Sequence, residues 1–314
     1  MSEISVFGEG LIMNYGETEA LKGVDFSINK GEIFGFIGPD GAGKTSLFRI
    51  LTTLLLPFSG HAFIEGYDVV KDYRQLRKIL GYMPGKFSLY QDLTVEENLK
   101  FFAGIFKVDI EQNYHLISDI YDQIAPFRKR RAGKLSGGMK QKLALCCALI
   151  HKPEVLILDE PTTGVDAVSR REFWDMLLRL KQSGITILVA TPYMDEALLC
   201  DRVALMQHGS IMAIDTPHAI ITSYPQRLFR IVTKETLAEL SRLRQVPGIS
   251  SAEIFGQFIH VSMDTKFTNG GNFDEFLKKM AMDNIAFEEI SPGIEDCFIY
   301  FMKQNENSIK SLYS

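Results

Sequence analysis

An eight-residue stretch near the start of the chain combines three glycines with a lysine and a threonine, residue types that can together hold a chain of phosphates. It reads Gly38-Pro39-Asp40-Gly41-Ala42-Gly43-Lys44-Thr45 and fits the pattern G-x-x-x-x-G-K-S/T at every fixed position. Glycines allow successive backbone N–H groups to turn inward around phosphate oxygens. The Lys44 ammonium can reach the β- and γ-phosphates, and the Thr45 hydroxyl can bind Mg²⁺. The stretch therefore predicts a site for a nucleoside triphosphate.

The residues on either side of this stretch agree with that prediction. Residues 32–37 have the composition of a buried strand, and an amphipathic helix follows and stops before Pro57. The start of that helix presents the positive end of its dipole to the phosphates, and Ser46 is a further phosphate donor. A chance glycine-rich turn is the alternative, but such a turn does not require a strand before it and a helix after it.

Two adjacent carboxylates follow a second apolar run. Residues 155–158 are all apolar, as expected of a buried strand, and Asp159 and Glu160 come directly after them. Near a bound triphosphate, Asp159 can hold Mg²⁺, usually through water, and Glu160 can orient and activate the water that attacks the γ-phosphate. An ordinary acidic turn at a strand end is the alternative, and the phosphate-binding stretch upstream favours the catalytic interpretation.

The elements that must position these groups alternate between strand and helix. Residues 185–190 form another apolar run, and this alternation indicates a parallel sheet whose carboxyl ends meet at the nucleotide. Residues 4–37 read as short strands, with Tyr15 in the turn between two of them. Tyr15 could stack on an adenine face, and an ordinary exposed tyrosine is the alternative.

A helical segment follows the first strands and helix. Thr94 and Glu97 have the spacing of a capping box, so we expect an amphipathic helix from there to about residue 127. Ser136 with Gly137 and Gly138 begins another helix, whose free N–H groups can bind an anion. Taken alone, those three residues favour an ordinary capped helix over an anion site.

Composition and charge limit the classes of partner. The 314 residues are 46% hydrophobic, with a net charge of -5 and a pI near 5.8, so no nucleic-acid partner is expected. The basic run at residues 128–131 is interpreted as a solvated face, or as a contact for phosphates or a partner. The four cysteines lie in apolar segments and read as reduced, buried thiols. No apolar run is long enough to span a bilayer, so we expect any membrane role to act through a partner.

Together these motifs resemble the ATP-binding subunit of ABC transporters over about residues 4–220. Residues 38–45 resemble its Walker A loop, residues 135–139 its signature motif, and residues 156–160 its Walker B strand with the catalytic glutamate. Asp166 lies in the D-loop position, and Tyr15 occupies the place of the adenine-stacking aromatic. The resemblance implies that two such domains enclose two ATP molecules head to tail, each signature serving the site of the other chain.

Two positions depart from the family's pattern. This chain has Gly85 at the Q-loop position, where the family has glutamine, and Pro192 at the H-loop position, where it has histidine. Neither side chain can donate a hydrogen bond or coordinate through oxygen or nitrogen. Because losing one preorganised transition-state donor typically costs roughly 10²–10³ in rate, we expect this chain's own site to bind MgATP but to hydrolyse it slowly. Its intact signature would complete a faster site on a different subunit, and a homodimer in which Glu160 suffices is the alternative.

The predicted fold is α/β, a P-loop NTPase of the ABC type in residues 1–222 with a helical subdomain at about residues 88–152. Residues 223–314 are predicted to form an accessory domain, because residues 229–290 show the strand-helix-strand-strand-helix-strand order of a small α+β ferredoxin-like fold before a terminal helix. This module carries no catalytic set. We expect it to regulate or to stabilise a dimer, or only to complete the fold.

The ending Pro292-x-x-Glu295-Asp296-x-Phe298 is similar to ATPases of ABC-2 type exporters. We therefore expect a peripheral ATPase on the cytoplasmic face of the cell membrane, working with an integral membrane subunit and a second ABC ATP-binding domain. By the resemblance, a groove for the membrane subunit would be lined by Phe87, Leu89, Tyr90 and Leu93, with core packing as the alternative for each. Two other functions stay open: a soluble ABC ATPase without a transporter, and a nucleotide-gated partner with little hydrolysis.

Overall fold

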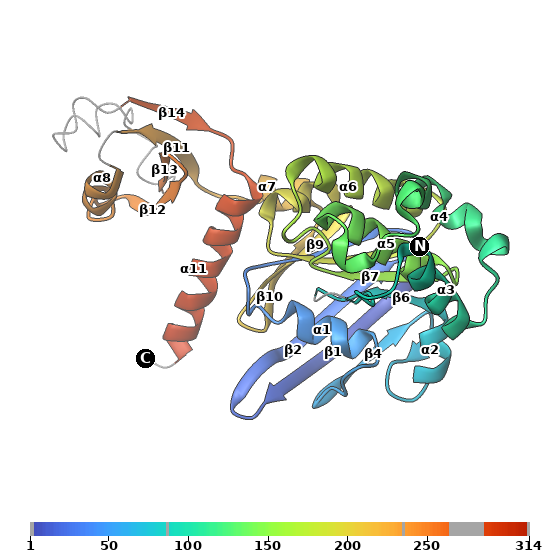
Figure 1. The fold of residues 1–314 in the computed structure, drawn as a ribbon. Helices are drawn as coiled ribbons and strands as arrows, with labels where there is room; N and C mark the ends of the chain where they lie inside the picture. The colour runs from blue at the N-terminus through green and yellow to red at the C-terminus, as the bar shows by residue number, and fades with distance from the viewer. Residues whose placement is uncertain (1–2, 86–87, 234–235, 264–285, 313–314) are drawn as a thin grey trace. The chain divides into compact units, whose positions relative to one another are not determined.

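The glycine-rich stretch joins the third strand of the protein to its first helix. The computed structural model describes residues 3–85, 88–233, 236–263 and 286–312. Strand β3 (Ile33–Ile37) ends where the stretch begins, and helix α1 (Lys44–Leu51) starts at its lysine (Figure 1). The chain divides into two compact units, residues 1–218 with 301–314 and residues 219–300. The domain boundary expected after residue 222 stays a prediction.

A six-stranded sheet forms the centre of the first unit. Its strand order is β10-β9-β3-β8-β7-β6, and every neighbouring pair is parallel except β9 with the edge strand β10. The carboxyl ends of the five parallel strands therefore share one edge of the sheet, as the sequence predicts. The strands that join β3 in this sheet are β6 (Leu80–Met83), β7 (Val155–Asp159), β8 (Thr186–Thr191), β9 (Arg202–Gln207) and β10 (Ser210–Asp215).

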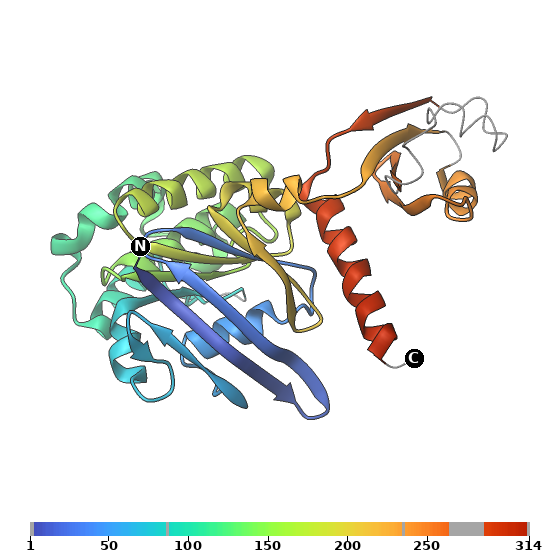
Figure 2. The ribbon, with the colours of Figure 1, turned by 180° about the vertical axis from the view of Figure 1, so that it is seen from behind.

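An antiparallel sheet of four strands, in the order β2-β1-β4-β5, makes up a second layer. Helix α1 contacts β2 and β4 of this sheet and β7 of the six-stranded sheet, so it lies between the two layers. Helix α6 (Ala167–Gln182) lies on the far side of the six-stranded sheet (Figures 1 and 2). The strands of the antiparallel layer are β1 (Ile4–Tyr15), β2 (Thr18–Asn29), β4 (Ser59–Ile64) and β5 (Tyr67–Asp68).

The predicted helical segment is two helices rather than one. The capping box is confirmed, because the Thr94 hydroxyl accepts from the Glu97 amide at 3.2 Å and the Glu97 carboxylate accepts from the Thr94 amide at 2.8 Å. A single helix to about residue 127 is wrong: α3 (Val95–Phe106) ends at Lys107, which adopts a left-handed backbone with φ 55. Asp109 then caps α4 (Ile110–Ile124), and α5 (Gly137–Leu149) packs against both helices.

The remaining elements of the first unit are short. Helix α2 (Tyr73–Ile79) directly precedes β6. The 3-10 turns lie at Ala125–Phe127, Ala132–Lys134 and Met194–Leu199, and helix α7 (Pro217–Thr222), which follows β10, continues from the first unit into the second. Cys146, Cys147, Cys200 and Cys297 are all free and buried, and burial raises the pKa of each thiol, as expected of inert reduced cysteines. Within the described residues no helix combines the length and the apolar character needed to cross a bilayer.

The second unit is built on its own antiparallel sheet in the order β12-β13-β11-β14. This is the strand order of a ferredoxin-like fold, and helix α8 (Thr236–Leu243) packs on β12 and β13. A second helix, predicted at residues 273–282, lies outside the described residues. Helix α11 (Ile294–Leu312) follows the last strand. The four strands are β11 (Arg227–Val232), β12 (Ile249–Phe255), β13 (Phe258–Met263) and β14 (Ala286–Ile290).

Candidate nucleotide site

The loop between β3 and α1 has the shape of a cradle that only glycine permits at two positions. Gly43 adopts φ 103, and a Cβ added there would lie 2.5 Å from the Ala20 carbonyl oxygen. A Cβ on Gly38 would lie 2.1 Å from the Met206 carbonyl oxygen. Both glycines therefore hold the backbone against neighbouring strands, which leaves the loop's N–H groups free to face an anion at the start of α1.

Lys44 is folded onto this loop. It is 3% exposed, and its Nζ donates to the carbonyl oxygens of Gly38 at 2.6 Å and Pro39 at 2.9 Å. Burial lowers the pKa of Lys44, while the nearby carboxylates, Glu160 foremost, oppose that shift. The ammonium is thus fixed at the mouth of the cradle, where a β- or γ-phosphate would lie.

Thr45 and Asp159 are neighbours across the site. The Thr45 hydroxyl donates to Asp159 Oδ1 at 3.1 Å, which joins the start of α1 to the carboxyl end of β7. Asp159 is 3% exposed, and burial raises the pKa of its carboxyl group, an effect that the Thr45 hydrogen bond partly offsets. A hydroxyl and a carboxylate side by side are the oxygen ligands that Mg²⁺ uses together with water and phosphate. The residues present therefore fit a magnesium ion that a bound nucleotide helps to hold.

Glu160 adopts an unusual backbone conformation at the end of β7. Its φ is 50, in the left-handed region, and its amide donates to the Ala190 carbonyl oxygen at 2.8 Å. The Thr163 hydroxyl donates to Glu160 Oε2 at 3.3 Å. The carboxylate lines the nucleotide cavity beside the glycine loop, where it can accept a proton from an attacking water.

A cavity of about 430 Å³ is lined by the end of the glycine loop together with Lys44, Thr45 and Glu160. Tyr15, which is 44% exposed at the end of β1, lines it, and its hydroxyl lies 3.4 Å from that of Ser46. The residues that line the cavity are Tyr15, Thr18, Glu19, Ala20, Lys22, Gly41, Ala42, Gly43, Lys44, Thr45, Ser46, Glu160 and His208.

Lys22 and His208 are cavity residues that sequence reasoning missed. The Gly209 amide donates to the Ala42 carbonyl oxygen at 3.1 Å, and the Lys22 amide donates to the Gly209 carbonyl oxygen at 2.9 Å. The turn between β9 and β10 is therefore attached both to the glycine loop and to β2. Residues 208 and 209 read as a turn after an apolar run, but only the adjacency of β9 and β3 places that turn at the site.

The signature and D-loop residues form capped helix starts away from this cavity. Ser136 Oγ accepts from the Met139 amide at 3.4 Å, which confirms the predicted start of α5. Asp166 accepts from the amides of Val168 and Ser169, and the hydrogen bond from Ser169 is the main reason that the pKa of Asp166 is lowered. None of Ser136, Gly137, Gly138 and Asp166 lines the cavity of the same chain.

The two departures from the family pattern both border the site. Gly85 follows β6, and a Cβ added to it would lie 3.0 Å from the Asp159 carbonyl oxygen. Pro192 follows β8, whose last residue, Thr191, accepts a hydrogen bond from the Gly38 amide at 3.3 Å. A smaller cavity of about 190 Å³ lies beside Gly85, with Thr163 and Gly164 among the residues that line it. Position 85 therefore lies beside Asp159, and position 192 directly follows the residue that is bonded to the glycine loop, but neither residue lines the nucleotide cavity.

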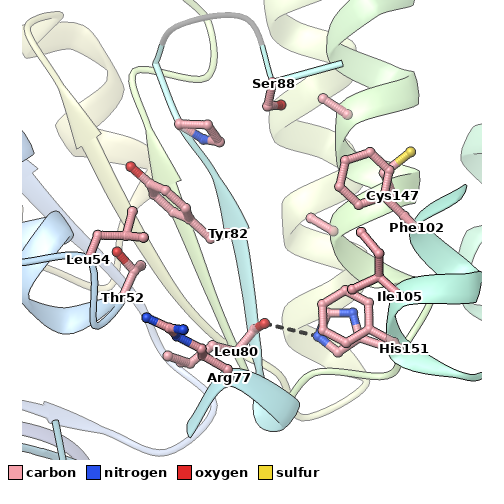
Figure 3. Close-up of a pocket in the computed structure, with 14 residues that line it drawn as sticks. Thr52, Leu54, Arg77, Leu80, Tyr82, Ser88, Phe102, Ile105, Cys147 and His151 are labelled. Atoms are coloured by element: carbon pink, nitrogen blue, oxygen red, sulfur yellow. Dashed lines mark hydrogen bonds between the residues drawn. The ribbon is translucent and has the colours of Figure 1, made fainter. Parts of the chain in front are cut away.

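A separate groove of about 470 Å³ lies between the β6 side of the sheet and helices α3 and α5 (Figure 3). Leu54, Leu80, Phe102 and Ile105 make its walls largely apolar, and Arg77 adds a cation. The residues predicted to form a groove behave differently. Leu89 is buried beside the smaller cavity, and Tyr90 packs on Phe101 with ring centroids 4.5 Å apart. The larger groove is not lined by Leu89, Tyr90 or Leu93. Phe87 lies outside the described residues.

His151 closes one end of this groove. Its Nε2 lies 2.9 Å from the Leu80 carbonyl oxygen, and its ring stacks on Phe106 with centroids 3.7 Å apart. Burial lowers the pKa of His151, so the ring is neutral near pH 7. The bond ties the end of α2 and start of β6 to the end of α5, which keeps the two walls of the groove at a fixed separation.

Comparisons of the sequence and of the fold with known proteins both find ATP-binding proteins of ABC transporters. A sequence model of the family described as "ABC transporter" matches residues 21–163. The chain is 40% identical over 284 residues to the "Probable multidrug ABC transporter ATP-binding protein YbhF" of Escherichia coli, which covers 89% of this chain and 48% of that protein. The chain therefore spans about half the length of that relative.

A second relative and a solved structure match more of their own length. The chain is 31% identical over 311 residues to the "Daunorubicin resistance ATP-binding protein DrrA2" of Streptomyces coeruleorubidus, and the match covers 95% of each chain. A structure titled "Structure of ATP binding subunit of ABC transporter" superposes with a TM-score of 0.64 and 25% identity, covering 70% of this chain and 93% of that one.

Proposed function

The chain belongs to the ABC transporter family as an ATP-binding ATPase of the exporter kind, and from this premise we propose that it drives export as one half of a head-to-tail dimer of nucleotide domains. The observation that carries the proposal is the convergence of the glycine loop, Lys44, Thr45 and Glu160 on one cavity, with Asp159 hydrogen-bonded to Thr45 at its edge. In this proposal Mg²⁺ is held by Thr45 and Asp159, and Glu160 accepts the proton of the attacking water.

The second domain is required because the chain does not complete its own site. Ser136 caps the start of α5, and the backbone amide groups there can bind an anion. This helix start does not line the chain's own nucleotide cavity. Ser136, Gly137 and Gly138 would therefore contact the γ-phosphate bound to a partner domain, and Asp166 would lie at the same interface. Binding of MgATP would hold the two domains together, and hydrolysis would release them.

This arrangement is tested by a variant that spoils only the partner's site. We expect Ser136→Asp to bind MgATP with normal affinity in calorimetry, because its own cradle is intact, but to fail to associate with its partner domain in sedimentation experiments with MgATP. The added carboxylate would repel the partner's γ-phosphate. A loss of MgATP affinity in Ser136→Asp as large as its loss of association would contradict an action in trans.

We also propose that turnover at this chain's own cradle is slow. Gly85 and Pro192 remove two polar side chains from the border of the site while the phosphate and magnesium groups are kept. The intact signature of this chain would then complete a faster site on a different ATPase subunit. We expect low ATPase activity for the purified chain and a marked increase on addition of that subunit. If the purified chain alone hydrolyses ATP as fast as the mixture of the two subunits does, the result would favour a homodimer in which Glu160 is sufficient for hydrolysis.

A nucleotide-gated role with little hydrolysis is the second candidate function, and the same two positions favour it. In that case MgATP would close the dimer and release of nucleotide, rather than hydrolysis, would reopen it. The two candidates separate in a single-turnover assay of the complete transporter, because only the first produces ADP on the time scale of transport.

The groove of about 470 Å³ is the surface we propose for a membrane subunit. Ile105 is 56% exposed on α3 and Leu54 is 56% exposed after α1, so both present apolar surface that an apolar helical segment could cover. We expect Ile105→Asp to abolish copurification with the membrane subunit and to leave MgATP binding intact. Leu237→Asp is the matched control, since Leu237 is 74% exposed in the second unit.

We propose that residues 1–222 are the ATP-binding domain and that residues 223–314 are an accessory domain at the cytoplasmic face of the membrane. The ferredoxin-like strand order of β11 to β14 supports a separate fold for the second part. Deletion of residues 223–314 should leave MgATP binding by the rest of the chain measurable by calorimetry. Loss of all folding in that deletion would contradict the proposed boundary.

A further inference from the structure

The turn that carries Glu160 is held from behind by a buried polar cluster. Thr162 is 1% exposed and donates its hydroxyl hydrogen bond to Glu196 Oε1 at 2.7 Å. Glu196 is 2% exposed and lies in the 3-10 segment Met194–Leu199, two turns beyond the end of β8. Arg170 of α6 approaches the same Glu196 oxygen at 3.9 Å. The turn after β7, helix α6 and the 3-10 segment after β8 therefore meet at one carboxylate.

The turn itself transmits position from Thr162 to Glu160. The Thr163 amide donates to the Glu160 carbonyl oxygen at 3.2 Å, and the Val165 amide donates to the Thr162 carbonyl oxygen at 3.2 Å. The Thr163 hydroxyl also donates to Glu160 Oε2 at 3.3 Å. Because these bonds form two overlapping turns, a displacement of Thr162 moves Thr163, and with it the direction of the Glu160 carboxylate.

The segment after Pro192 is tied to the same helix. The Arg170 guanidinium lies over the Tyr193 ring at 4.8 Å and 3.7 Å from the Asp195 carboxylate. The Arg170 amide donates to the Asp166 carbonyl oxygen at 2.9 Å, at the start of α6. The cluster thus links the residues that follow the H-loop position to the turn between Glu160 and Asp166, although position 192 itself has no polar side chain.

The chemistry of Glu196 points to more than filling space. Its Oε2 is buried and, among the residues that the structure describes, has no hydrogen-bond partner. A buried carboxylate oxygen without a partner is unfavourable, and an apolar side chain of similar volume would often serve packing as well or better. A carboxylate retained in such a place is therefore best explained by what its bonded oxygen does.

We infer that Glu196 is a positioning residue for ATP hydrolysis, which acts through Thr162 to fix the turn at residues 160–166 and the direction of the Glu160 carboxylate. It does not touch the nucleotide cavity. The inference rests on the ATPase activity of the family and on the proposed role of Glu160, and it does not depend on slow turnover.

The test is a single-turnover measurement with protein in excess over MgATP, which reports slow rates as well as fast ones. Thr162→Val keeps the shape of the side chain and removes its donor, so we expect hydrolysis to slow by about fivefold to tenfold, as for loss of one hydrogen bond of ordinary strength. The MgATP dissociation constant from calorimetry should change by less than about twofold, because the glycine cradle is untouched. Thr162→Ser should restore most of the rate.

Thr186→Val is the matched control. Thr186 is 0% exposed and its hydroxyl oxygen accepts from the Gly31 amide at 3.0 Å, at the end of β8 opposite to the nucleotide site. We expect this variant to lower the melting temperature and to leave the rate unchanged. If Thr162→Val behaves like Thr186→Val, the cluster is only structural and the inference is overturned.

A double-mutant cycle adds a second readout. Glu196→Gln keeps an acceptor for Thr162 but removes the charge that Arg170 faces, so we expect a smaller loss of rate than in Thr162→Val. The double variant should be no slower than Thr162→Val by more than about twofold, since both changes act on one linkage. If the rate losses of the two single variants multiply in the double variant, or if MgATP affinity falls as much as the rate does, Glu196 does not act through Thr162 and the inference is overturned. The wild-type rate itself tests the proposed slow turnover, whereas only the ratio of variant to wild type tests this inference.

Discussion

The two sides of the nucleotide cavity differ in how completely they are built. On the side of the β3 loop, the cradle, Lys44 and the Thr45–Asp159 pair are all present and joined by hydrogen bonds. On the side where β6 and β8 end, Gly85 and Pro192 contribute no polar side chain. In the proposed function, groups of the first kind would hold the triphosphate before the reaction, while those of the second kind would act on water and the γ-phosphate as the reaction proceeds.

In the proposed function, MgATP binding and ATP turnover can therefore be separated within one site. An interaction made equally in the ground state and the transition state improves affinity but not the rate of the chemical step. The complete side of the cavity supplies interactions of that kind, so its preservation is sufficient for nucleotide-driven association. In the proposed function, the incomplete side would leave Glu160 as the main group of this chain that promotes hydrolysis.

The largest expected effect tests this dependence on Glu160. Glu160→Gln removes the proton acceptor and keeps the size of the side chain, so we expect the single-turnover rate to fall by roughly 10²–10⁴. MgATP affinity should be preserved, because the cradle and magnesium ligands are intact. An unchanged rate would mean that another group activates the water, and the contrast between the two sides would then be misplaced.

The next effect asks whether the incomplete side can be restored. Gly85→Gln combined with Pro192→His should raise the rate by roughly 10²–10³, the range associated with a preorganised transition-state donor. Gly85→Ala is the control, because a Cβ at this position lies 3.0 Å from the Asp159 carbonyl oxygen and must displace it slightly. We expect no gain in that control. Equal rates for the natural chain and the restored variant would remove the case for slow turnover.

Lys44→Ala examines the complete side. A charge-assisted contact to phosphate is worth about 1.5–3 kcal/mol, so MgATP affinity should fall by about 10-fold to 100-fold. Calorimetry measures the change directly, and Lys71→Ala serves as control because the Lys71 side chain is 81% exposed and pairs with Asp68 outside the cavity. Unaltered binding in Lys44→Ala would show that this side is not the phosphate site.

The smallest effect concerns the base of the nucleotide. Tyr15→Ala should weaken MgATP binding by no more than about tenfold, since aromatic contacts contribute about 0.5–1.5 kcal/mol. Tyr15→Phe keeps the ring and should retain the affinity, although it loses the 3.4 Å contact with Ser46. If the phenylalanine variant binds as weakly as the alanine variant, the hydroxyl rather than the ring face makes the contact.

Patterns of adjacent residues predicted the fold and most of the candidate site. The glycine-rich loop, the carboxylates at the end of β7 and the capping box at Thr94 are each set by neighbours in the sequence. The same holds for the helix start at Ser136. Local backbone chemistry decides these features, so the sequence is enough to find them.

Features that depend on long-range packing were not predictable in this way. Lys107 ends α3 in a left-handed backbone conformation. A lysine in the sequence does not indicate this conformation, and the helical pattern continues on both sides of it. His208 reaches the cavity only because β9 pairs with β3. The contact of Gly85 with Asp159 likewise follows from the pairing of β6 with β7, and no spacing in the sequence reports it.

The left-handed backbone of Glu160 sets folding and chemistry against each other at one residue. A side chain with a Cβ in this conformation costs roughly 1–2 kcal/mol relative to glycine, which adopts it freely. Replacing Glu160 with glycine should therefore raise the thermal midpoint of the protein even as it removes the proton acceptor. The native chain tolerates a permanent local instability at the position where it has the most chemical use for a carboxylate.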